Sequence, residues 1–421
     1  MTDADPANGD DRWWRNAVIY EVYVRSFADA DGSGVGDLRG ITARLDHLAE
    51  LGVDAIWLSP FYPSPMADGG YDVADYRDVE PALGTLDDFD VMRAEAHRRG
   101  MRIIVDLVPN HTSDQHPWFQ AALAAAPGSA ERARYIFREG TGPNADQPPT
   151  DWVSNFGGSS WSRSPDGEWY LHMFAPEQPD LDWSNPEVRA EFRSVLRFWL
   201  DRGVDGFRID VAHGLAKHLE EPLPALGVRS VDRVLRYQVE DHPLWDRDDV
   251  HEIYRDWRLV LDEYSPPRMA VAEAWVAPGR RGRYVRPDEL HQAFNFDFLE
   301  TPWECGAFVD VVDGSMKEAF DVGASPTWVL SNHDVVRHAS RYGLPPRTDT
   351  TAWLLSNGTT PPVDRELGLR RARAAALLML ALPGSAYVYQ GEEFGLHEVA
   401  DLPSTVLQDP TWERSNHREK G

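Results

Sequence analysis

Two kinds of hydrophobic pattern alternate along the chain, and together they predict a repeated strand-helix fold. Short apolar runs rich in β-branched and aromatic residues predict buried strands, and longer runs with apolar residues at helical spacing predict amphipathic helices. The predicted strands are Ala17–Val24, Val53–Leu58, Arg102–Leu107, Val204–Ile209, Met269–Glu273, Ala293–Phe296, Thr327–Ser331 and Ala386–Gln390. The predicted helices are Ile41–Leu51, Leu86–Arg99, Pro186–Arg202, Val250–Tyr264, Pro302–Ala319 and Leu369–Leu382. Eight strands alternating with helices favour an α/β fold in which a parallel sheet closes into a (β/α)8 barrel.

Three connections depart from this repeat. The stretch between Leu107 and Pro186 is rich in Gly, Pro, Ser and Trp and shows no barrel-like helix. A structureless loop of that length is improbable in a compact domain. We therefore predict an inserted domain over residues 111–183, which divides the barrel domain into residues 1–110 and 184–421. The fifth connection, Pro278–Leu290, is short and weakly helical, and Pro345–Asp364 predicts a long surface loop.

Composition narrows the classes of partner. With a net charge of −27, the chain repels phosphate backbones and anionic lipids, so we expect neither nucleic acid nor a membrane surface as a partner. A neutral substrate such as a sugar meets no such repulsion. The longest apolar run, Ala374–Leu382, is too short to cross a bilayer. A single cysteine, Cys305, excludes a disulfide framework, and Met1–Trp14 lacks the apolar core of a signal peptide, so we predict a cytoplasmic protein. The sequence does not indicate an oligomeric state.

Charged side chains gather at the predicted ends of four barrel strands, where the chemistry of such barrels is located. Arg208 and Asp210 lie two apart on a strand, so their side chains share one face. A guanidinium beside a carboxylate favours its charged form, which a nucleophile needs, while a second acid in a less polar place stays protonated. Glycoside hydrolysis uses such a pair. A lone Asp at a strand end is more often a loop cap, but convergence of Asp106, Asp210, Glu273 and Asp334 on one rim is hard to explain structurally.

These segments resemble the α-amylase superfamily, glycoside hydrolase family 13. DLVPNH (106–111), GFRIDVAH (206–213), AEAW (272–275) and SNHD (331–334) resemble its four signature regions in order. QPDLDW (178–183) resembles the region that ends its inserted B domain, and GSAYVYQGEE (384–393) resembles its eighth strand. The oligo-1,6-glucosidase and α-glucosidase branch is most similar, although Asp182 stands where that branch has Asn. The resemblance implies a TIM barrel with the B domain after the third strand.

The resemblance also implies roles for individual residues. Asp210 would form the covalent β-glycosyl intermediate, and Glu273 would protonate the leaving oxygen and then activate water. Asp334 would hold hydroxyls of the reacting sugar, and Asp106 would support Arg208, which orients Asp210. The remaining residues implied to bind substrate are Tyr71, Asp72, His111, Arg208 and His333. Tyr71 and Asp72 match residues that close the blind end of the sugar pocket, although aromatic packing explains Tyr71 equally well.

The loop after the first strand offers a metal site. Alternating oxygen-bearing residues and glycines suit a hard cation such as Ca2+ or Mg2+. The residues concerned are Asp29, Asp31, Ser33, Val35 (through its carbonyl) and Asp37. The branch often holds a metal here, but Ser33 replaces an expected Asp, and a Gly/Asp turn without metal explains the pattern nearly as well. Nothing in the sequence suggests an organic cofactor.

Together these features predict a glycoside hydrolase, a retaining α-glucosidase that releases terminal α-linked glucose from short oligosaccharides by double displacement. A transglycosylase or isomerase acting on sucrose or maltose, of the sucrose isomerase or trehalose synthase type, would keep the same residues. A non-catalytic relative is a third alternative. In this branch, a valine after the nucleophile, as at Val211, goes with a preference for α-1,6 linkages. The residues that follow it here are Ala-His-Gly rather than the usual Ile-Asn, so the sequence leaves the linkage preference open. Members of the branch carry a C-terminal β-domain that is not visible in this sequence, so we expect apolar surface of the barrel to be exposed. They also carry an arginine that pairs with the residue matching Asp72, and because no matching arginine is visible, we expect Asp72 to be unpaired.

Overall fold

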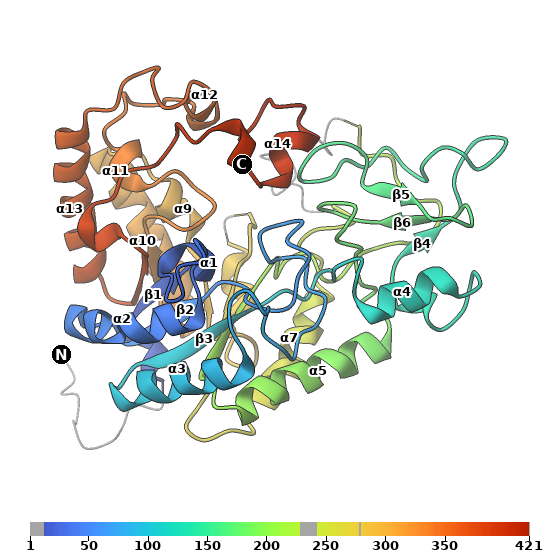
Figure 1. Cartoon of the computed structure of the whole chain (residues 1–421), viewed down its shortest axis with the longest axis horizontal. Coiled ribbons are helices and arrows are strands. Elements are labelled where there is room, and N and C mark those ends of the chain that lie inside the picture. The colour runs from blue at the N-terminus through green and yellow to red at the C-terminus, as the bar shows by residue number, and fades with distance from the viewer. Residues whose placement is uncertain (1–11, 228–241, 278, 421) are drawn as a thin grey trace.

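The computed structural model describes residues 12–227, 242–277 and 279–420, and its centre is an eight-stranded parallel barrel (Figure 1). Its strands are β1 (Val18–Val22), β2 (Ala55–Leu58), β3 (Arg102–Leu107), β7 (Gly206–Ile209), β8 (Met269–Ala272), β9 (Gln292–Ala293), β10 (Thr327–Val329) and β11 (Ser385–Tyr389). Their order around the sheet is β10-β11-β1-β2-β3-β7-β8-β9. At the seam, the hydroxyl of Thr327 donates to the Ala293 carbonyl at 2.6 Å, which links β10 to β9. The predicted TIM barrel is confirmed.

Amphipathic helices cover the outside of the barrel. They are α2 (Leu38–Leu51), α3 (Leu86–Arg98), α5 (Pro186–Asp201), α7 (Val250–Leu261), α10 (Cys305–Asp321) and α13 (Arg365–Ala381). Local sequence sets where they begin: Asp37 caps α2 by accepting from the Gly40 N–H, and Asn185 caps α5, with Pro186 in the first turn. The shorter helical elements are η1 (Trp13–Asn16), α1 (Val24–Phe27), α8 (Arg281–Tyr284), α9 (Phe296–Glu300), α11 (His338–Arg341) and α12 (Thr350–Leu355).

Two of the irregular connections contain short helices. The weak fifth connection holds only the four-residue helix α8, and its first residue, Pro278, lies outside the described residues. The loop predicted over Pro345–Asp364 contains α12, so that prediction was wrong in part. Asp349 caps this helix by accepting from the Ala352 N–H, and Trp353, a residue of the helix itself, is buried. One buried aromatic side chain holds a helix too short to show a periodic pattern.

The insertion between β3 and α5 has a small antiparallel sheet of its own (Figure 1). Its elements are α4 (Pro117–Ala124), η2 (Arg132–Arg134), β4 (Phe137–Arg138), β5 (Trp161–Arg163) and β6 (Trp169–Leu171). A β-bridge between His111 and Asp180 joins its two ends. The buried amine of Lys217 then ties them to the loop after β7, with bonds of 3.1 Å to Asp180 and 2.8 Å to the Asn110 side chain. The exact boundaries at 111 and 183 stay a prediction.

The segment after β11 runs across the mouth of the barrel to the insertion (Figure 1). It holds η4 (Glu392–Phe394), η5 (Ser404–Val406) and α14 (Pro410–Arg414), and in its described residues it adds no further sheet. Arg25 donates to the Gln408 side chain at 2.6 Å, and Arg414 donates to the Gly157 carbonyl at 2.6 Å. The segment is therefore anchored on both sides of the mouth.

The outer face of the barrel, the N-terminal residues and the length of the helices each bear on a prediction from the sequence. The outward face of α13 exposes Leu377 and Leu380, at 72% and 53%, which agrees with the predicted exposed apolar barrel surface. Residues 1–11, which carry most of the argument against a signal peptide, lie outside the described residues. Throughout the described ranges, every helix is too short or too polar to cross a membrane.

Candidate active site

A cavity of about 560 Å3 opens at the carboxyl ends of the barrel strands. Most of the predicted site residues meet there. Those that line it are Tyr71, His111, Arg208, Asp210, Glu273, His333 and Asp334. Because these residues come from distant segments of the sequence, it is the fold that brings them together.

One guanidinium organises the centre of this cavity. Arg208 projects from β7 with only 2% of its surface exposed. Its Nη1 donates to Asp106 Oδ1 at 2.9 Å and to Asp210 Oδ1 at 2.5 Å, and its Nη2 lies 3.3 Å from Glu273 Oε2. Asp106 is fully buried, and both of its carboxylate oxygens accept from the same Arg208 nitrogen. Such a bridge fixes the relative positions of Asp210 and Glu273.

The protonation of the two central acids is set by opposing effects. Burial raises the pKa of Asp210 while contact with Arg208 opposes the rise. Burial also raises the pKa of Glu273, with Arg208 opposing and the charge of Asp334 adding to the rise. Asp210 has the shorter contact with the guanidinium, so its charged form gains more from the ion pair. Burial therefore raises the pKa of both acids, and the shorter ion pair opposes the rise more strongly at Asp210 than at Glu273.

Two donors hold the carboxyl group of Glu273 in place. Its Oε2 accepts from the Val211 N–H at 2.7 Å, and its Oε1 accepts from Trp275 Nε1 at 3.0 Å. Val211 has a φ of +46°, a conformation that is rare for a β-branched residue. The residue that follows Asp210 in the sequence therefore has a strained backbone, and its N–H is the one that donates to Glu273.

The two histidines have opposite charge preferences. His111 is buried against Gln178, with 3.0 Å between its Nε2 and the amide nitrogen, and burial lowers its pKa to about 3. His333 lies between two carboxylates, 2.5 Å from Glu21 and 3.2 Å from Asp334. Burial alone would lower the pKa of His333, but Asp334 and Glu21 outweigh it and raise the pKa to about 9. At neutral pH, a neutral ring therefore lies on one side of the cavity and a cationic ring on the other.

The part of the cavity around Tyr71 differs from the prediction at one residue. Tyr71 lines the cavity, with its hydroxyl 2.8 Å from His333 Nε2. Asp72 is not among the described residues that line the cavity; Asp68 is. The Asp72 carboxylate accepts from the Ala67 and Asp68 N–H groups at 2.9 and 3.0 Å and from the Ser64 hydroxyl at 2.8 Å. It braces its own loop, so the expectation of an unpaired Asp72 was wrong.

Asp68 lines the cavity where the sequence predicts Asp72. It accepts from Gln178 Nε2 at 2.8 Å, and burial raises its pKa to about 7. Gly69 and Gly70, with φ of +58° and +112°, turn the chain so that Asp68 and Tyr71 face the same space. The Asp-Gly-Gly-Tyr spacing was the available signal. Glu21, also missed, had a signal too: it is the single charge inside the apolar run Ala17–Val24.

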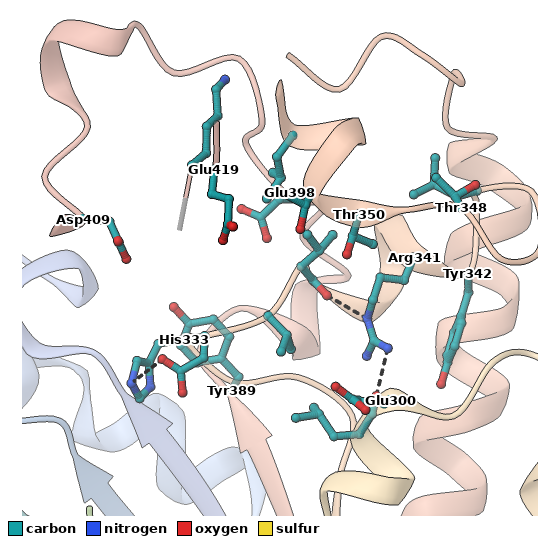
Figure 2. Close-up of a pocket in the computed structure, with 18 of the residues that line it drawn as sticks. Glu300, His333, Arg341, Tyr342, Thr348, Thr350, Tyr389, Glu398, Asp409 and Glu419 are labelled. Atoms are coloured by element: carbon teal, nitrogen blue, oxygen red, sulfur yellow. Dashed lines mark hydrogen bonds and ion pairs between the residues drawn. The ribbon is translucent and has the colours of Figure 1, made fainter. Parts of the chain in front are cut away.

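A second, wider cavity of about 1050 Å3 continues outward from the first. Asp68, Tyr71, Glu300, His333, Asp334 and Asp409 line both. Figure 2 shows His333 and Asp409 on one side of this outer cavity and Arg341, Tyr342 and Thr348 on the other. Glu419, from the segment after β11, also lines it. The catalytic cavity thus opens into a wide vestibule lined by both polar and apolar side chains.

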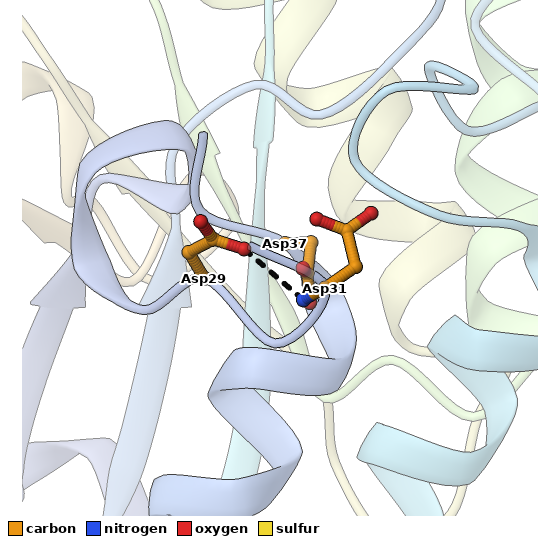
Figure 3. A group of neighbouring side chains, drawn as sticks. All are labelled: Asp29, Asp31 and Asp37. Atoms are coloured by element: carbon orange, nitrogen blue, oxygen red, sulfur yellow. Dashed lines mark hydrogen bonds between the residues drawn. The ribbon is translucent and has the colours of Figure 1, made fainter. Parts of the chain in front are cut away.

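The predicted metal loop lies away from this site, after β1. One carboxylate oxygen from each of Asp29, Asp31 and Asp37 lies within 4.8 Å of the others (Figure 3). Asp29 accepts from the Gly32 and Gly34 N–H groups, each at 2.7 Å, and Asp37 also caps α2. Ser33 donates to the Val35 carbonyl at 3.3 Å. A set of ligands made only of oxygen atoms fits a hard cation. Some lone pairs of the Asp29 and Asp37 carboxylates already accept hydrogen bonds from the backbone.

Comparisons with known proteins agree with this geometry. The model of the family described as "Alpha amylase, catalytic domain" matches residues 21–420. A probable alpha-glucosidase of Rhizobium meliloti is 41% identical over 95% of this chain, and an oligo-1,6-glucosidase of Parageobacillus thermoglucosidasius is 37% identical over 92%. The chain spans 70% and 66% of the lengths of these relatives.

Solved structures give the same result. An alpha-glucosyl transfer enzyme superposes with a TM-score of 0.78 at 34% identity, over 97% of this chain and 74% of its own. A trehalulose synthase superposes with a TM-score of 0.80 at 32% identity, over 96% of this chain and 70% of its own. The chain therefore belongs to the alpha-amylase family of glycoside hydrolases.

Proposed function

We propose that the protein is a retaining α-glucosidase that releases terminal glucose from short α-linked oligosaccharides. The observation that carries this proposal is the contact of one buried guanidinium with both Asp210 and Glu273. Retaining enzymes need their two carboxyl groups close together, whereas inverting enzymes keep them apart to leave room for water. Two carboxylates bridged by one arginine suit the retaining arrangement.

In the proposed reaction, Asp210 attacks the anomeric carbon while Glu273 protonates the departing oxygen. The second step reverses these roles: Glu273 takes a proton from water, the water oxygen attacks the anomeric carbon, and the bond to Asp210 breaks. His333 and Asp334 would hold the sugar hydroxyls, and the neutral His111 would accept or donate one hydrogen bond. Asp68 and Tyr71 would close the pocket behind the non-reducing end, which suits removal of terminal glucose.

Trapping the intermediate tests this mechanism directly. A fluorinated glucosyl fluoride that reacts quickly but hydrolyses slowly should add one glycosyl unit to the protein, and peptide mapping should place it on Asp210. The Glu273→Gln variant should lose most of its hydrolysis of oligosaccharides, whose leaving groups need a proton, and much less of its reaction with the glucosyl fluoride. Labelling of another carboxylate, or unchanged oligosaccharide hydrolysis by Glu273→Gln, would refute the assignment.

A transglycosylase or isomerase is the second candidate, because the structural neighbours include an alpha-glucosyl transfer enzyme and a trehalulose synthase. Both activities would use the same glycosyl-enzyme and differ only in what attacks it. Product analysis on maltose, isomaltose, sucrose and trehalose separates them, since free glucose dominates in hydrolysis and new disaccharides dominate otherwise. With three carboxylates converging on the cavity, a non-catalytic role has little support.

A structural cation in the loop after β1 remains a proposal. Asp29, Asp31 and Asp37 would hold Ca2+ or Mg2+ and stiffen the loop that precedes α2, far from any catalytic step. The cytoplasmic location likewise remains a prediction from the sequence.

A further inference from the structure

The turn that follows Asp210 contacts Glu273 through its backbone. Val211 has a φ of +46°, and its N–H donates to Glu273 Oε2 at 2.7 Å. The next N–H, of Ala212, donates to the Glu273 carbonyl at 2.8 Å. Because the backbone conformation of Val211 is unfavourable for a β-branched residue, the packing around the turn has to maintain it.

Trp245 packs against this turn. Its side chain is buried and belongs to the same hydrophobic cluster as Val211. Gly214 lies between the two, and a Cβ at Gly214 would come within 2.8 Å of both the Trp245 ring and Val211 Cγ1. The Trp245 ring also stacks on His213, with 5.0 Å between ring centroids. Packing as close as this resists a change in the backbone conformation of the turn.

Asp246, the residue after Trp245, forms an ion pair with an arginine of a different loop. Arg280 Nε donates to Asp246 Oδ2, and its Nη2 donates to the Asp246 carbonyl at 2.7 Å. The Tyr284 hydroxyl donates to Asp246 Oδ1 at 2.8 Å. The Asp246 N–H in turn donates to the His213 carbonyl at 2.7 Å. The Arg280 and Asp246 side chains are only 17% and 14% exposed, so solvent screens their attraction little.

These contacts form a closed ring that passes through the ends of β7 and β8. Arg280 lies on the connection that leaves β8, the strand that precedes Glu273. Its partner Asp246 holds the turn that leaves β7, and that turn returns to Glu273 through the Val211 N–H. A displacement at Arg280 therefore reaches the Glu273 carboxyl group, and a shift of ~1 Å in a reacting group can lower a rate by ~10^2-fold.

We propose that Arg280 and Asp246 are positioning residues, whose ion pair keeps the Glu273 carboxyl group aligned with the departing oxygen. Both lie outside the set of described residues that line the catalytic cavity, so they act through Trp245 and the turn at Val211. The inference rests on the proposed function, because it requires Glu273 to protonate the leaving group. A loss of alignment should therefore impair most the substrates whose leaving group needs that proton.

Two substrates that differ only in a nitro group test the inference. Phenolate needs more help from an acid to leave than 4-nitrophenolate does, so phenyl α-glucoside depends more on Glu273 than 4-nitrophenyl α-glucoside. The ratio of their kcat/KM values is independent of the fraction of protein that is folded. Arg280→Met should lower kcat/KM by about thirtyfold for the phenyl substrate and by about threefold for the nitrophenyl substrate. Equal losses on both substrates, or no loss, would overturn the inference.

A milder variant and a matched control locate the effect at the ion pair. Asp246→Asn keeps the shape of the side chain and removes its charge, so it should shift the same ratio by about threefold even if Arg280→Met folds poorly. Arg283→Met, on α8, breaks the exposed pair to Asp248 and should leave the ratio unchanged. An unchanged ratio in Asp246→Asn, or an equal shift in Arg283→Met, would overturn the inference.

Glu273→Gln separates this inference from the proposed function. It should shift the ratio in the same direction as Arg280→Met and by a larger factor, because it removes the acid itself. If Glu273→Gln leaves the ratio unchanged, or if the parent protein cleaves neither substrate, the proposed function and the inference are both overturned. If Glu273→Gln shifts the ratio and Arg280→Met does not, only the inference is overturned.

Discussion

Paired charges surround His333 in the catalytic cavity, whereas packed aromatic rings lie beside Glu273. His333 has specific charged partners in Glu21 and Asp334. Trp275, which donates to Glu273, stacks on Phe296 and presents a flat surface with little directionality. Hydrogen-bonded ion pairs discriminate by geometry, while apolar surfaces discriminate mainly by area. Substitutions around His333 should therefore impair the chemistry, and substitutions in the aromatic stack should mainly redistribute products.

The largest effect should come from Asp210→Asn. The amide cannot form the glycosyl ester, so kcat for an aryl α-glucoside should fall by ~10^4-fold or more. Asp313→Asn, on the exposed face of α10, is the matched control and should keep full activity. Steady-state rates measured at enzyme concentrations high enough to detect residual turnover decide the matter. A loss of less than tenfold in Asp210→Asn would assign the nucleophile elsewhere.

The next effect separates Asp68 from Asp72, two acids of the same loop with different surroundings. Asp68→Asn should lower kcat/KM by ~10^2-fold, because Asp68 lines the cavity and would contact the terminal sugar. Asp72→Asn weakens the brace to Ala67, Asp68 and Ser64 and should lower the melting temperature by ~2–4 °C. Kinetics and thermal melts on both variants measure this. If Asp72→Asn caused the larger kinetic loss without a loss of stability, the assignment of Asp68 rather than Asp72 to the cavity would be wrong.

A smaller effect concerns pH and the Glu21–His333 pair. Asp334, Glu21, Tyr71 and Arg208 surround the His333 ring. Its pKa in the folded protein is raised to about 9, so the stabilisation from the charged ring is complete below its ordinary pKa near 6.5 and disappears as pH rises through 9. We expect kcat/KM to fall on the alkaline side over the same range.

Glu21→Gln preserves a hydrogen-bond acceptor for His333 while removing the charge. The alkaline limb of the pH profile should move to lower pH by about one unit, as ~1.4 kcal/mol of lost ion-pair energy implies. Histidine nitrogen chemical shifts measured by NMR should follow the same change. A pH profile that stays in place, with only a uniform loss of activity, would mean that Glu21 has a structural role alone.

The smallest effect should come from the loop after β1. If Asp29, Asp31 and Asp37 hold Ca2+ or Mg2+, chelation should lower the melting temperature by ~2–4 °C and leave initial rates nearly unchanged. Asp31→Asn should abolish the difference between chelated and Ca2+-loaded protein. Elemental analysis of the purified protein supplies a second readout, and the same melting temperature with and without Ca2+ or Mg2+ would argue for a metal-free turn.

Sequence patterns predicted the barrel well because each strand is a local apolar run, and the strand-end acids well because a barrel must gather them at one rim. Asp68 was harder to predict, since two left-handed glycines decide whether it or Asp72 faces the cavity. Glu21 was missed because its partner, His333, is 312 residues away, and only the closed barrel joins β1 to the loop after β10. The stack of Trp275 on Phe296 had the same difficulty, because the two residues follow consecutive strands and their stacking depends on side-chain packing. Local sequence patterns predict the strands and helices. Contacts between side chains that are distant in sequence can be predicted only once the fold is known.

The central claim is that Asp210 and Glu273 carry out a double displacement, and the anomer released first tests it most directly. Proton NMR of early products from an α-glucoside, recorded before mutarotation, should show α-glucose, because two inversions at the anomeric carbon restore its configuration. β-Glucose as the first product would show a single displacement by water and would contradict the proposed roles of both residues.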